Sequence, residues 1–268
     1  MTSKIMRVGD IIYQYYNSYD NRGNLVKETN DRDLDAVIKS YTYDATNKMV
    51  SGTNEKGEVS AYTYNGLGVL VNNTKTTADR MLSTDYVVDY TSGIQNNLMA
   101  QEAGGLDYRY VYGLNGRISA NVKNTQTGES LKLYIQNDRL GSGRFASNES
   151  GEVVWFTDID VWGNVLEKIM PSLGGKSVNV LNNYTNYDFD DMLEIYYTKA
   201  RMYDPEDRRF LAADPVKGVV SDPQSMNLYA YVLNNPLKFI DLLGFVYTPT
   251  YVPIVDAFKL VDGSPMYA

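Results

Sequence analysis

The 268-residue chain contains no histidine and no cysteine, so any chemistry has to rest on other side chains. Catalysis by imidazole or thiolate, serine triads and His/Cys metal sites are excluded within this polypeptide. Carboxylates remain, with 33 aspartates and glutamates against 25 lysines and arginines. Two carboxyl groups held close together can hydrolyse a peptide bond, because one keeps a proton while the other activates water. Pairs of acidic residues are therefore the candidates for chemistry, and we predict neither a cofactor nor a metal.

The charge balance limits the classes of partner. The net charge is −8 and the isoelectric point is near 4.7, whereas a nucleic-acid backbone or an anionic membrane surface needs a basic face. No apolar segment reaches the length of about 18 residues that spans a bilayer. The first 25 residues also lack the basic and then apolar pattern of a signal peptide. We therefore expect no nucleic-acid partner and no membrane span.

A tyrosine repeat defines the elements that must position any acidic pair. The tyrosines recur with successive gaps of 24, 21, 22, 26 and 22 residues, and the clearest copies continue with aspartate or asparagine and a turn. A period of this length predicts a repeat-built protein. The repeat positions are Tyr19, Tyr43, Tyr64, Tyr86, Tyr112 and Tyr134, with a degenerate copy at Ile159–Asn164.

Alternating apolar and polar residues between these positions predict strands with one buried face, as in Glu58–Tyr64. Glycine-containing segments at 55–58, 126–129 and 149–152 have the composition of tight hairpin turns. A lone hairpin cannot bury its apolar face, so successive hairpins must pair edge to edge. We predict an all-β fold in which antiparallel hairpin repeats form a curved, spiralling sheet.

Tyrosine accounts for 24 residues, against two tryptophans and seven phenylalanines. The phenol ring suits a pleated surface, because it packs on a neighbouring strand while its hydroxyl reaches water or a backbone group. The tyrosines are therefore interpreted as structural. An aromatic platform for sugars is the alternative, and one sequence leaves it open.

The repeat pattern divides the chain into four parts. Hairpin repeats are predicted for residues 1–170, and a glycine-containing stretch that begins at Met170 predicts a loop at 171–183. Residues 184–245 carry denser and less periodic motifs. Residues 246–268 form a tail of 23 residues, too short for a domain with its own core.

Five motifs in a fixed order resemble the core region of Rhs/YD-repeat proteins. These proteins are bacterial polymorphic toxins, related to the C subunits of toxin complexes and, more distantly, to teneurins. The resemblance covers nearly the whole chain. The motifs are Tyr134–Ser142, Tyr196–Pro205, Arg208–Pro215, Asn227–Pro236 and Ile240–Phe245.

The resemblance implies a shell built from a β-ribbon around a C-terminal toxin, with an irregular core region that plugs one end. It also implies an intramolecular aspartic protease that cuts the chain just after a C-terminal motif. Asp214 matches the first aspartate motif, Asp241 matches the second, and Arg201 lies where an arginine could hold a carboxylate. Asp204 is a less suitable partner. The cleavage motif comprises Asp241, Leu242, Leu243, Gly244 and Phe245.

Each of these aspartates could instead serve only to close a turn. The chain also departs from the motifs of the family. One extra residue precedes Gly218 in the first motif, Leu242 replaces the usual proline, and the spacing of 27 positions from Asp214 to Asp241 is a few residues longer than usual. Loss of the proline removes a restraint on the preceding residue and could loosen the cleavage loop. At most we expect a single-turnover aspartic autoprotease.

These patterns predict a module that encapsulates a C-terminal effector segment in cis, with self-cleavage near Phe245. The tail is interpreted as a remnant or the first piece of that effector. Further Rhs repeats, an immunity protein and secretion machinery are the expected partners. The location is expected to be secreted or on the cell surface, as part of a larger protein. An extracellular adhesion or glycan-binding module is the main alternative, and a hydrolase that acts in trans is a weaker one.

Overall fold

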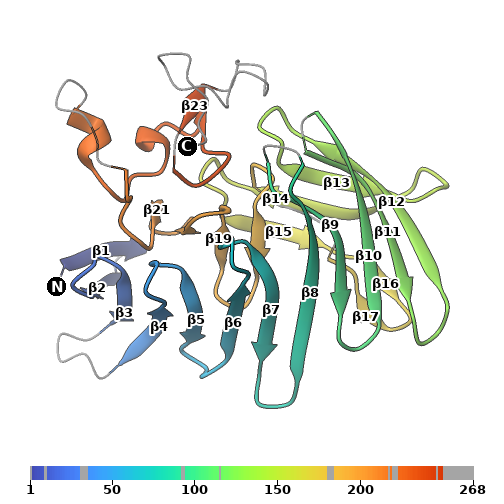
Figure 1. Cartoon of the computed structure of the whole chain (residues 1–268), viewed down its shortest axis with the longest axis horizontal. Helices are drawn as coiled ribbons and strands as arrows, with labels where there is room; N and C mark the ends of the chain where they lie inside the picture. Colours follow the sequence, from blue (N-terminus) through green and yellow to red (C-terminus); the bar gives the residue numbers. More distant parts are fainter. Residues whose placement is uncertain are drawn as a thin grey trace.

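One long antiparallel sheet dominates the protein (Figure 1). The computed structural model describes residues 2–8, 11–30, 36–91, 94–114, 116–179, 184–216, 218, 223–245 and 247–249. In this part of the chain the sheet has 15 strands in strictly sequential order, so each strand pairs with its neighbours in sequence. The predicted all-β fold of antiparallel hairpins is confirmed.

The strands of the large sheet are β1 (Thr2–Val8), β2 (Ile11–Tyr19), β3 (Leu25–Thr29), β4 (Val37–Tyr43), β5 (Met49–Asn54), β6 (Val59–Tyr64), β7 (Leu70–Thr76), β8 (Met81–Asp89), β9 (Asn96–Glu102), β10 (Leu106–Gly113), β11 (Gly116–Asn124), β12 (Ser130–Asn137), β13 (Gly143–Ser147), β14 (Val153–Ile159) and β15 (Val165–Ile169).

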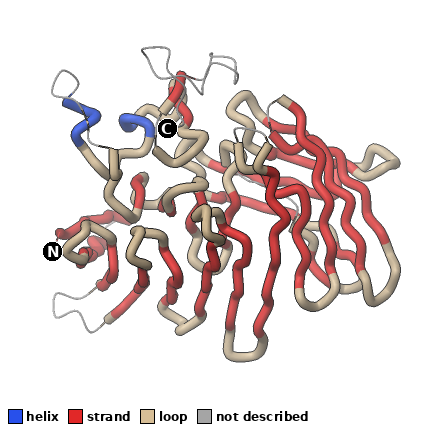
Figure 2. The backbone as a smooth tube through the Cα atoms, in the orientation of Figure 1, coloured by secondary structure: helices blue, strands red, loops and turns tan. Residues whose placement is uncertain are grey.

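Shorter elements follow the sheet, and Figure 2 shows how few of them are helical. They are β16 (Ser172–Leu173), β17 (Lys176–Ser177), β18 (Asp188–Asp190), β19 (Ile195–Tyr197), β20 (Met202–Asp204), β21 (Arg209–Phe210), the 3₁₀ helices η1 (Pro223–Met226) and η2 (Val232–Asn234), β22 (Phe239–Ile240) and β23 (Thr248–Pro249). Within the described ranges, no helix is long and apolar enough to cross a bilayer.

The aspartate of the tyrosine repeat closes the hairpin turn. Asp20 Oδ1 accepts hydrogen bonds from the amides of Arg22 and Asn24, both at 2.9 Å. Asp44 Oδ1 does the same for Thr46 at 2.7 Å and Lys48 at 3.0 Å. A short side chain that bonds backbone amides two and four residues ahead favours a turn over a continuing strand. The repeat aspartates are therefore structural.

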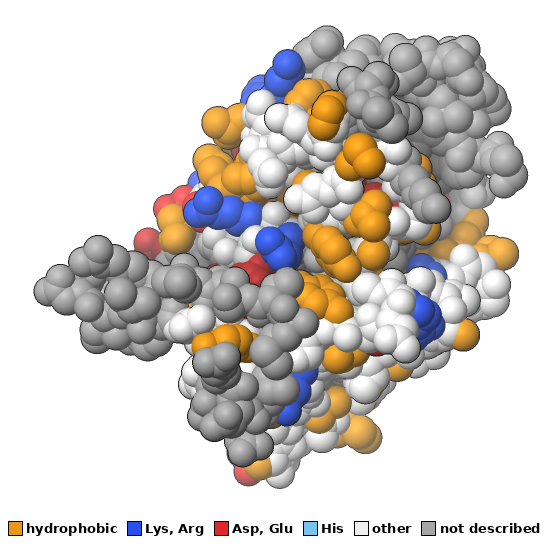
Figure 3. Space-filling model, turned by 90° about the vertical axis from the view of Figure 1, so that its left-hand side faces the viewer, with side chains coloured by type: hydrophobic (Ala, Val, Ile, Leu, Met, Phe, Trp, Pro, Cys, Tyr) orange, Lys and Arg blue, Asp and Glu red, His pale blue; other side chains and the backbone are white. Residues whose placement is uncertain are grey.

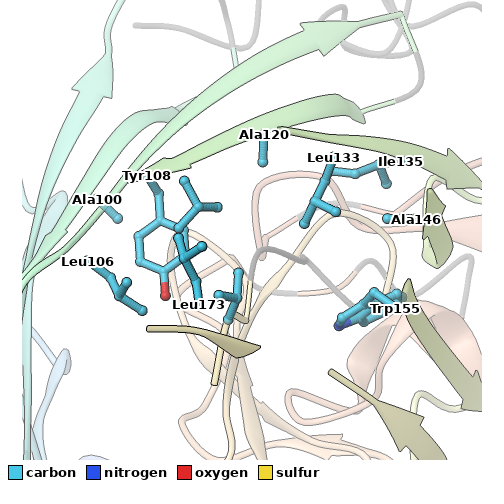
Figure 4. Close-up of a cluster of buried hydrophobic side chains, with 11 residues drawn as sticks. Ala100, Leu106, Tyr108, Ala120, Leu133, Ile135, Ala146, Trp155 and Leu173 are labelled. Carbon is cyan, nitrogen blue, oxygen red and sulfur yellow. The ribbon is translucent and has the colours of Figure 1, made fainter. Parts of the chain in front are cut away.

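Alternation along each strand divides the sheet into a covered inner face and an outer face. In β11, Ala120 and Val122 are buried, whereas Asn121 and Lys123 are exposed. Figure 4 shows side chains of β9 to β14 converging on Leu173 of β16. The segment predicted as a loop at 171–183 thus contains a small hairpin, β16–β17, that helps to cover the inner face.

Strand β19 lies against two distant parts of the large sheet. Tyr197 belongs to a buried cluster with residues of β4 to β7, and Ile195 lies in the same cluster. Tyr196 points the other way and donates a 2.7 Å hydrogen bond to the carbonyl of Gly163, in the turn between β14 and β15. The sheet therefore curls around the later segment, as Figure 1 shows.

Buried tyrosines form a third buried cluster, around the four-stranded sheet β18–β21. Their rings lie 4.3 to 6.4 Å apart between centroids, mostly tilted or edge to face, as aromatic pairs prefer. We call this group the tyrosine cluster. Its members are Tyr184, Tyr187, Tyr196, Tyr203 and Tyr231.

Candidate functional site

Arg201 is a buried arginine at the end of the turn between β19 and β20. The turn is closed by the amide of Thr198, which donates to the carbonyl of Arg201 at 3.0 Å. Only 6% of Arg201 is exposed, and its guanidinium carbon lies 3.6 Å from the ring centre of Phe210. A buried guanidinium needs partners for all its donors, and those partners define the site.

Both predicted aspartates converge on the same atom of Arg201. The Nη2 atom lies 2.8 Å from Asp214 Oδ2 and 4.0 Å from Asp241 Oδ2. Asp241 is only 3% exposed. The structure thus brings together the three residues to which the sequence assigns chemistry.

In each aspartate the two carboxyl oxygens have different partners. Asp214 Oδ1 accepts a 2.8 Å bond from the amide of Val216. Asp241 Oδ1 accepts bonds from the amides of Gly244 at 2.8 Å and Phe245 at 3.1 Å. The local turn therefore occupies Oδ1, as in the repeats, whereas Oδ2 faces Arg201. Each aspartate therefore both closes its local turn and belongs to the shared site.

Arg201 also holds the backbone of the predicted cleavage motif. Its Nε atom donates a 2.7 Å bond to the carbonyl of Gly244, and Nη1 donates a 3.2 Å bond to the carbonyl of Leu228. Gly244 has a φ of +75°, and a Cβ at this position would lie 2.6 Å from the carbonyl oxygen of Thr198. Only glycine fits there without strain.

Burial sets the electrostatics of the site. It raises the pKa of Asp214 above its ordinary value, against the opposing effect of the Arg201 guanidinium. Burial likewise lowers the pKa of Arg201, against the effects of the two carboxylates. Asp214 therefore keeps a proton to higher pH than an exposed aspartate would.

Asp204, the less suitable aspartate, has other partners. Its Oδ1 accepts bonds from the amides of Glu206 at 2.8 Å and Asp207 at 3.2 Å. Its Oδ2 lies 4.0 Å from Nζ of Lys39 in β4. This carboxylate joins the β20–β21 turn to the large sheet.

A small cavity of about 190 Å³ adjoins the three residues. Arg201, Asp214, Asp241, Phe245 and Tyr247 are among the residues that line it. Val246, which follows the predicted cleavage motif, lies outside the described residues.

Sequence reasoning missed Tyr187. This fully buried tyrosine donates a hydrogen bond from its hydroxyl to the main-chain carbonyl of Asp241. Tyr187 belongs to neither the repeat nor the ordered motifs, so spacing gave no sign of a role. The richness in tyrosine was the only available signal.

A larger cavity of about 680 Å³ lies between the inner face of the sheet and the segment after β15. Its lining mixes charges, with Lys75 and Arg117 of one sign and Glu102 and Asp188 of the other. On the face shown in Figure 3, the lysine and arginine side chains of the described residues are likewise scattered among apolar and acidic ones. Neither surface offers the concentrated positive charge that a phosphate backbone needs.

These features define an all-β protein, in which a sequential antiparallel meander curls around a docked segment with a buried Asp–Arg–Asp site. A known fold of this kind is found in a Tc holotoxin pore of Photorhabdus luminescens that contains TccC3. The TM-score is 0.61 at 17% identity, over 90% of this chain and 13% of that one.

Two curated proteins are similar in sequence to this chain. The tRNA3(Ser)-specific nuclease WapA of Bacillus spizizenii is 28% identical over 229 residues, 84% of this chain. The toxin protein Tse5 of Pseudomonas aeruginosa is 30% identical over 119 residues, 44% of this chain. The chain spans only 8% of the length of each relative. No protein-family model matches it. The chain is thus homologous to the YD-repeat toxins, and the predicted Rhs/YD-repeat resemblance is confirmed.

Proposed function

We propose that this chain is a wall segment of an Rhs-type shell, which holds a C-terminal effector segment in cis and cuts itself once near Phe245. The homology and the fold support the proposed role as a segment of the shell. The convergence of Asp214 and Asp241 on Nη2 of Arg201, beside the turn that precedes the tail, carries the proposal of cleavage.

The two carboxyl groups take different parts in the proposed hydrolysis. Asp214, whose pKa burial raises, acts as the acid and donates a proton to the leaving nitrogen of Val246. Asp241 as the carboxylate accepts a proton from water, which adds to the carbonyl carbon of the bond after Phe245. The C–N bond then breaks, which leaves a carboxyl group on Phe245 and an amine on Val246. Arg201 holds the preceding carbonyl, that of Gly244, and so anchors the segment that is cut.

Such a role implies a larger protein. Further Rhs repeats would complete the shell, and an effector would follow the tail. An immunity protein and secretion machinery are the proposed partners, and the proposed location is secreted or on the cell surface. The relatives of this chain are much longer proteins, which supports a role as one part of such an assembly.

The experiment is a mass measurement on the full chain with a folded domain fused after Ala268. We expect a fragment ending at Phe245, and its mass distinguishes a cut there from one at Gly244. Asp214→Asn should stay intact. Asp204→Asn is the matched control, since Asp204 also precedes a proline and is buried, and it should be cut like the wild type. An uncut wild-type chain would refute the protease.

The burial of several sheet tyrosines supports a structural role for them over a glycan-binding platform. Tyr41, Tyr62 and Tyr108 of the sheet are at most 6% exposed, so their ring faces are covered. The hydroxyls of Tyr62 and Tyr108 bond to Asp190 and Glu102. We expect a glycan array to show no binding above background, and specific binding there would revive the alternative.

A further inference from the structure

The hydroxyl of Tyr187 donates a hydrogen bond to the main-chain carbonyl of Asp241. Asp241 is 3% exposed, and a buried main-chain carbonyl needs a hydrogen-bond partner. The bond joins two elements 54 residues apart in the sequence. It fixes the peptide unit that links Asp241 to Leu242, at the start of the cleavage motif.

The ring of Tyr187 is itself held firmly. It is 1% exposed and lies among Tyr184, Tyr196 and Tyr231, with ring centroids 6.2 to 6.4 Å away. The Tyr187 hydroxyl has one proton, which it donates to Asp241. The hydroxyl of Tyr231, 3.4 Å away, therefore acts as the donor to Tyr187. The tyrosine cluster thus directs a short chain of hydroxyl groups at the motif.

The anchored residue has two functions in the proposed reaction. Asp241 Oδ1 holds the amides of Gly244 and Phe245, whereas Oδ2 faces Arg201. A rotation of the Asp241 backbone would move both oxygens. Reaction rates fall steeply when reacting groups are misplaced by about 1 Å. Loss of the hydrogen bond to the backbone would therefore displace the carboxyl group and slow the reaction.

We propose that Tyr187 is a positioning residue for self-cleavage, which orients the carboxyl group of Asp241 by holding its main-chain carbonyl. The inference rests on the proposed autoprotease, because it assigns a role within that reaction. Tyr187 itself donates no proton to the substrate and stays paired with the Asp241 carbonyl throughout.

The test compares two substitutions that each remove one buried hydroxyl. Tyr187→Phe loses the bond to Asp241. Tyr196→Phe loses an equivalent bond to the carbonyl of Gly163, within the same cluster and at 0% exposure. Single-turnover cleavage of the full-length fusion should slow by about tenfold or more in Tyr187→Phe and remain near the wild-type rate in Tyr196→Phe. Equal slowing in both variants would show a structural role only and overturn the proposal.

A pH–rate profile adds a second measurement, because a nonspecific loss of stability would not shift the pH dependence of cleavage. If Asp241 lies farther from the Arg201 guanidinium, its carboxylate loses part of its attraction to that positive charge. The rising limb of the profile should therefore shift to higher pH in Tyr187→Phe and stay in place in Tyr196→Phe. An unshifted limb in Tyr187→Phe would contradict the proposed orientation of the carboxyl group.

Hydrogen exchange separates failure of this inference from failure of the protease. In an Asp214→Asn background, which is expected to stay uncut, the amides of Gly244 and Phe245 report on their bonds to Asp241 Oδ1. They should exchange faster with Tyr187→Phe than with Tyr196→Phe. Unchanged exchange refutes the anchor even if the wild type is cut. If exchange is faster but the wild type is never cut, the anchoring role of Tyr187 is supported and the proposed self-cleavage is refuted.

Discussion

The Nε atom of Arg201 donates a 2.7 Å hydrogen bond to the carbonyl oxygen of Gly244, 43 residues away. The same guanidinium bonds the carbonyl of Leu228 and pairs with Asp214. One buried side chain thus joins three segments of the irregular region that follows the large sheet. Loss of Arg201 should therefore affect stability as well as any cleavage.

We predict that Arg201→Met lowers the free energy of unfolding by about 3–5 kcal/mol, because it leaves a half-buried carboxylate and two carbonyls without their partner. Urea denaturation measures the change. Arg144→Met is the control, since Arg144 forms an ion pair of the same 2.8 Å length with Asp158 but is far more exposed. Its removal should cost less than about 1 kcal/mol. Equal losses would show that burial does not matter here.

Asp214 should make stability depend on pH. Because burial raises its pKa in the folded state, the folded chain holds a proton that the unfolded chain releases at lower pH. The contribution is fully present below the unfolded pKa, near 3.8, and is lost as pH rises through the raised pKa. Relative to Asp214→Asn, the wild type should lose stability across that window. Urea titrations at a series of pH values test this prediction. A rise in the stability of the wild type relative to Asp214→Asn across that window would contradict it.

The turn aspartates should tolerate asparagine but not alanine. Asp44 acts through an acceptor oxygen on two amides, and Asn54 makes the same pair of bonds in its own turn, to Lys56 and Glu58. Asp44→Ala should cost about 1–2 kcal/mol, because two amides lose their partner, and Asp44→Asn should cost much less. Chemical denaturation distinguishes the two, and equal costs would mean that charge rather than the acceptor matters.

Gly52 in β5 tests how the later segment docks on the sheet. A Cβ at Gly52 would collide with the side chain of Leu193 and lie 3.1 Å from the ring of Tyr41. Gly52→Ala should therefore destabilise the fold by about 1–3 kcal/mol. A Cβ at Gly66 would meet nothing within 4 Å, so Gly66→Ala should change stability by less than about 0.5 kcal/mol. If Gly52→Ala leaves the stability unchanged, the docked segment shifts to accommodate the added methyl group at little cost.

The sequence alone determined the sheet and its turns. The tyrosine period, the alternation and the glycine-containing turns all act over short distances. The carboxylates of Asp20 and Asp44, for example, bond amides two and four residues ahead. Such local interactions can be inferred from spacing, because the chain cannot place these groups far apart.

Only the tertiary structure decided how the site is assembled. Asp214 and Asp241 reach Arg201 because β19 and β20 dock inside the curled sheet, and the anchor from Tyr187 crosses 54 residues. The resemblance named three of these residues but could not give their partners. Leu242 removes the local restraint that a proline would supply, whereas Tyr187 supplies one from a distance. Contacts between such remote residues depend on packing, which no local pattern encodes.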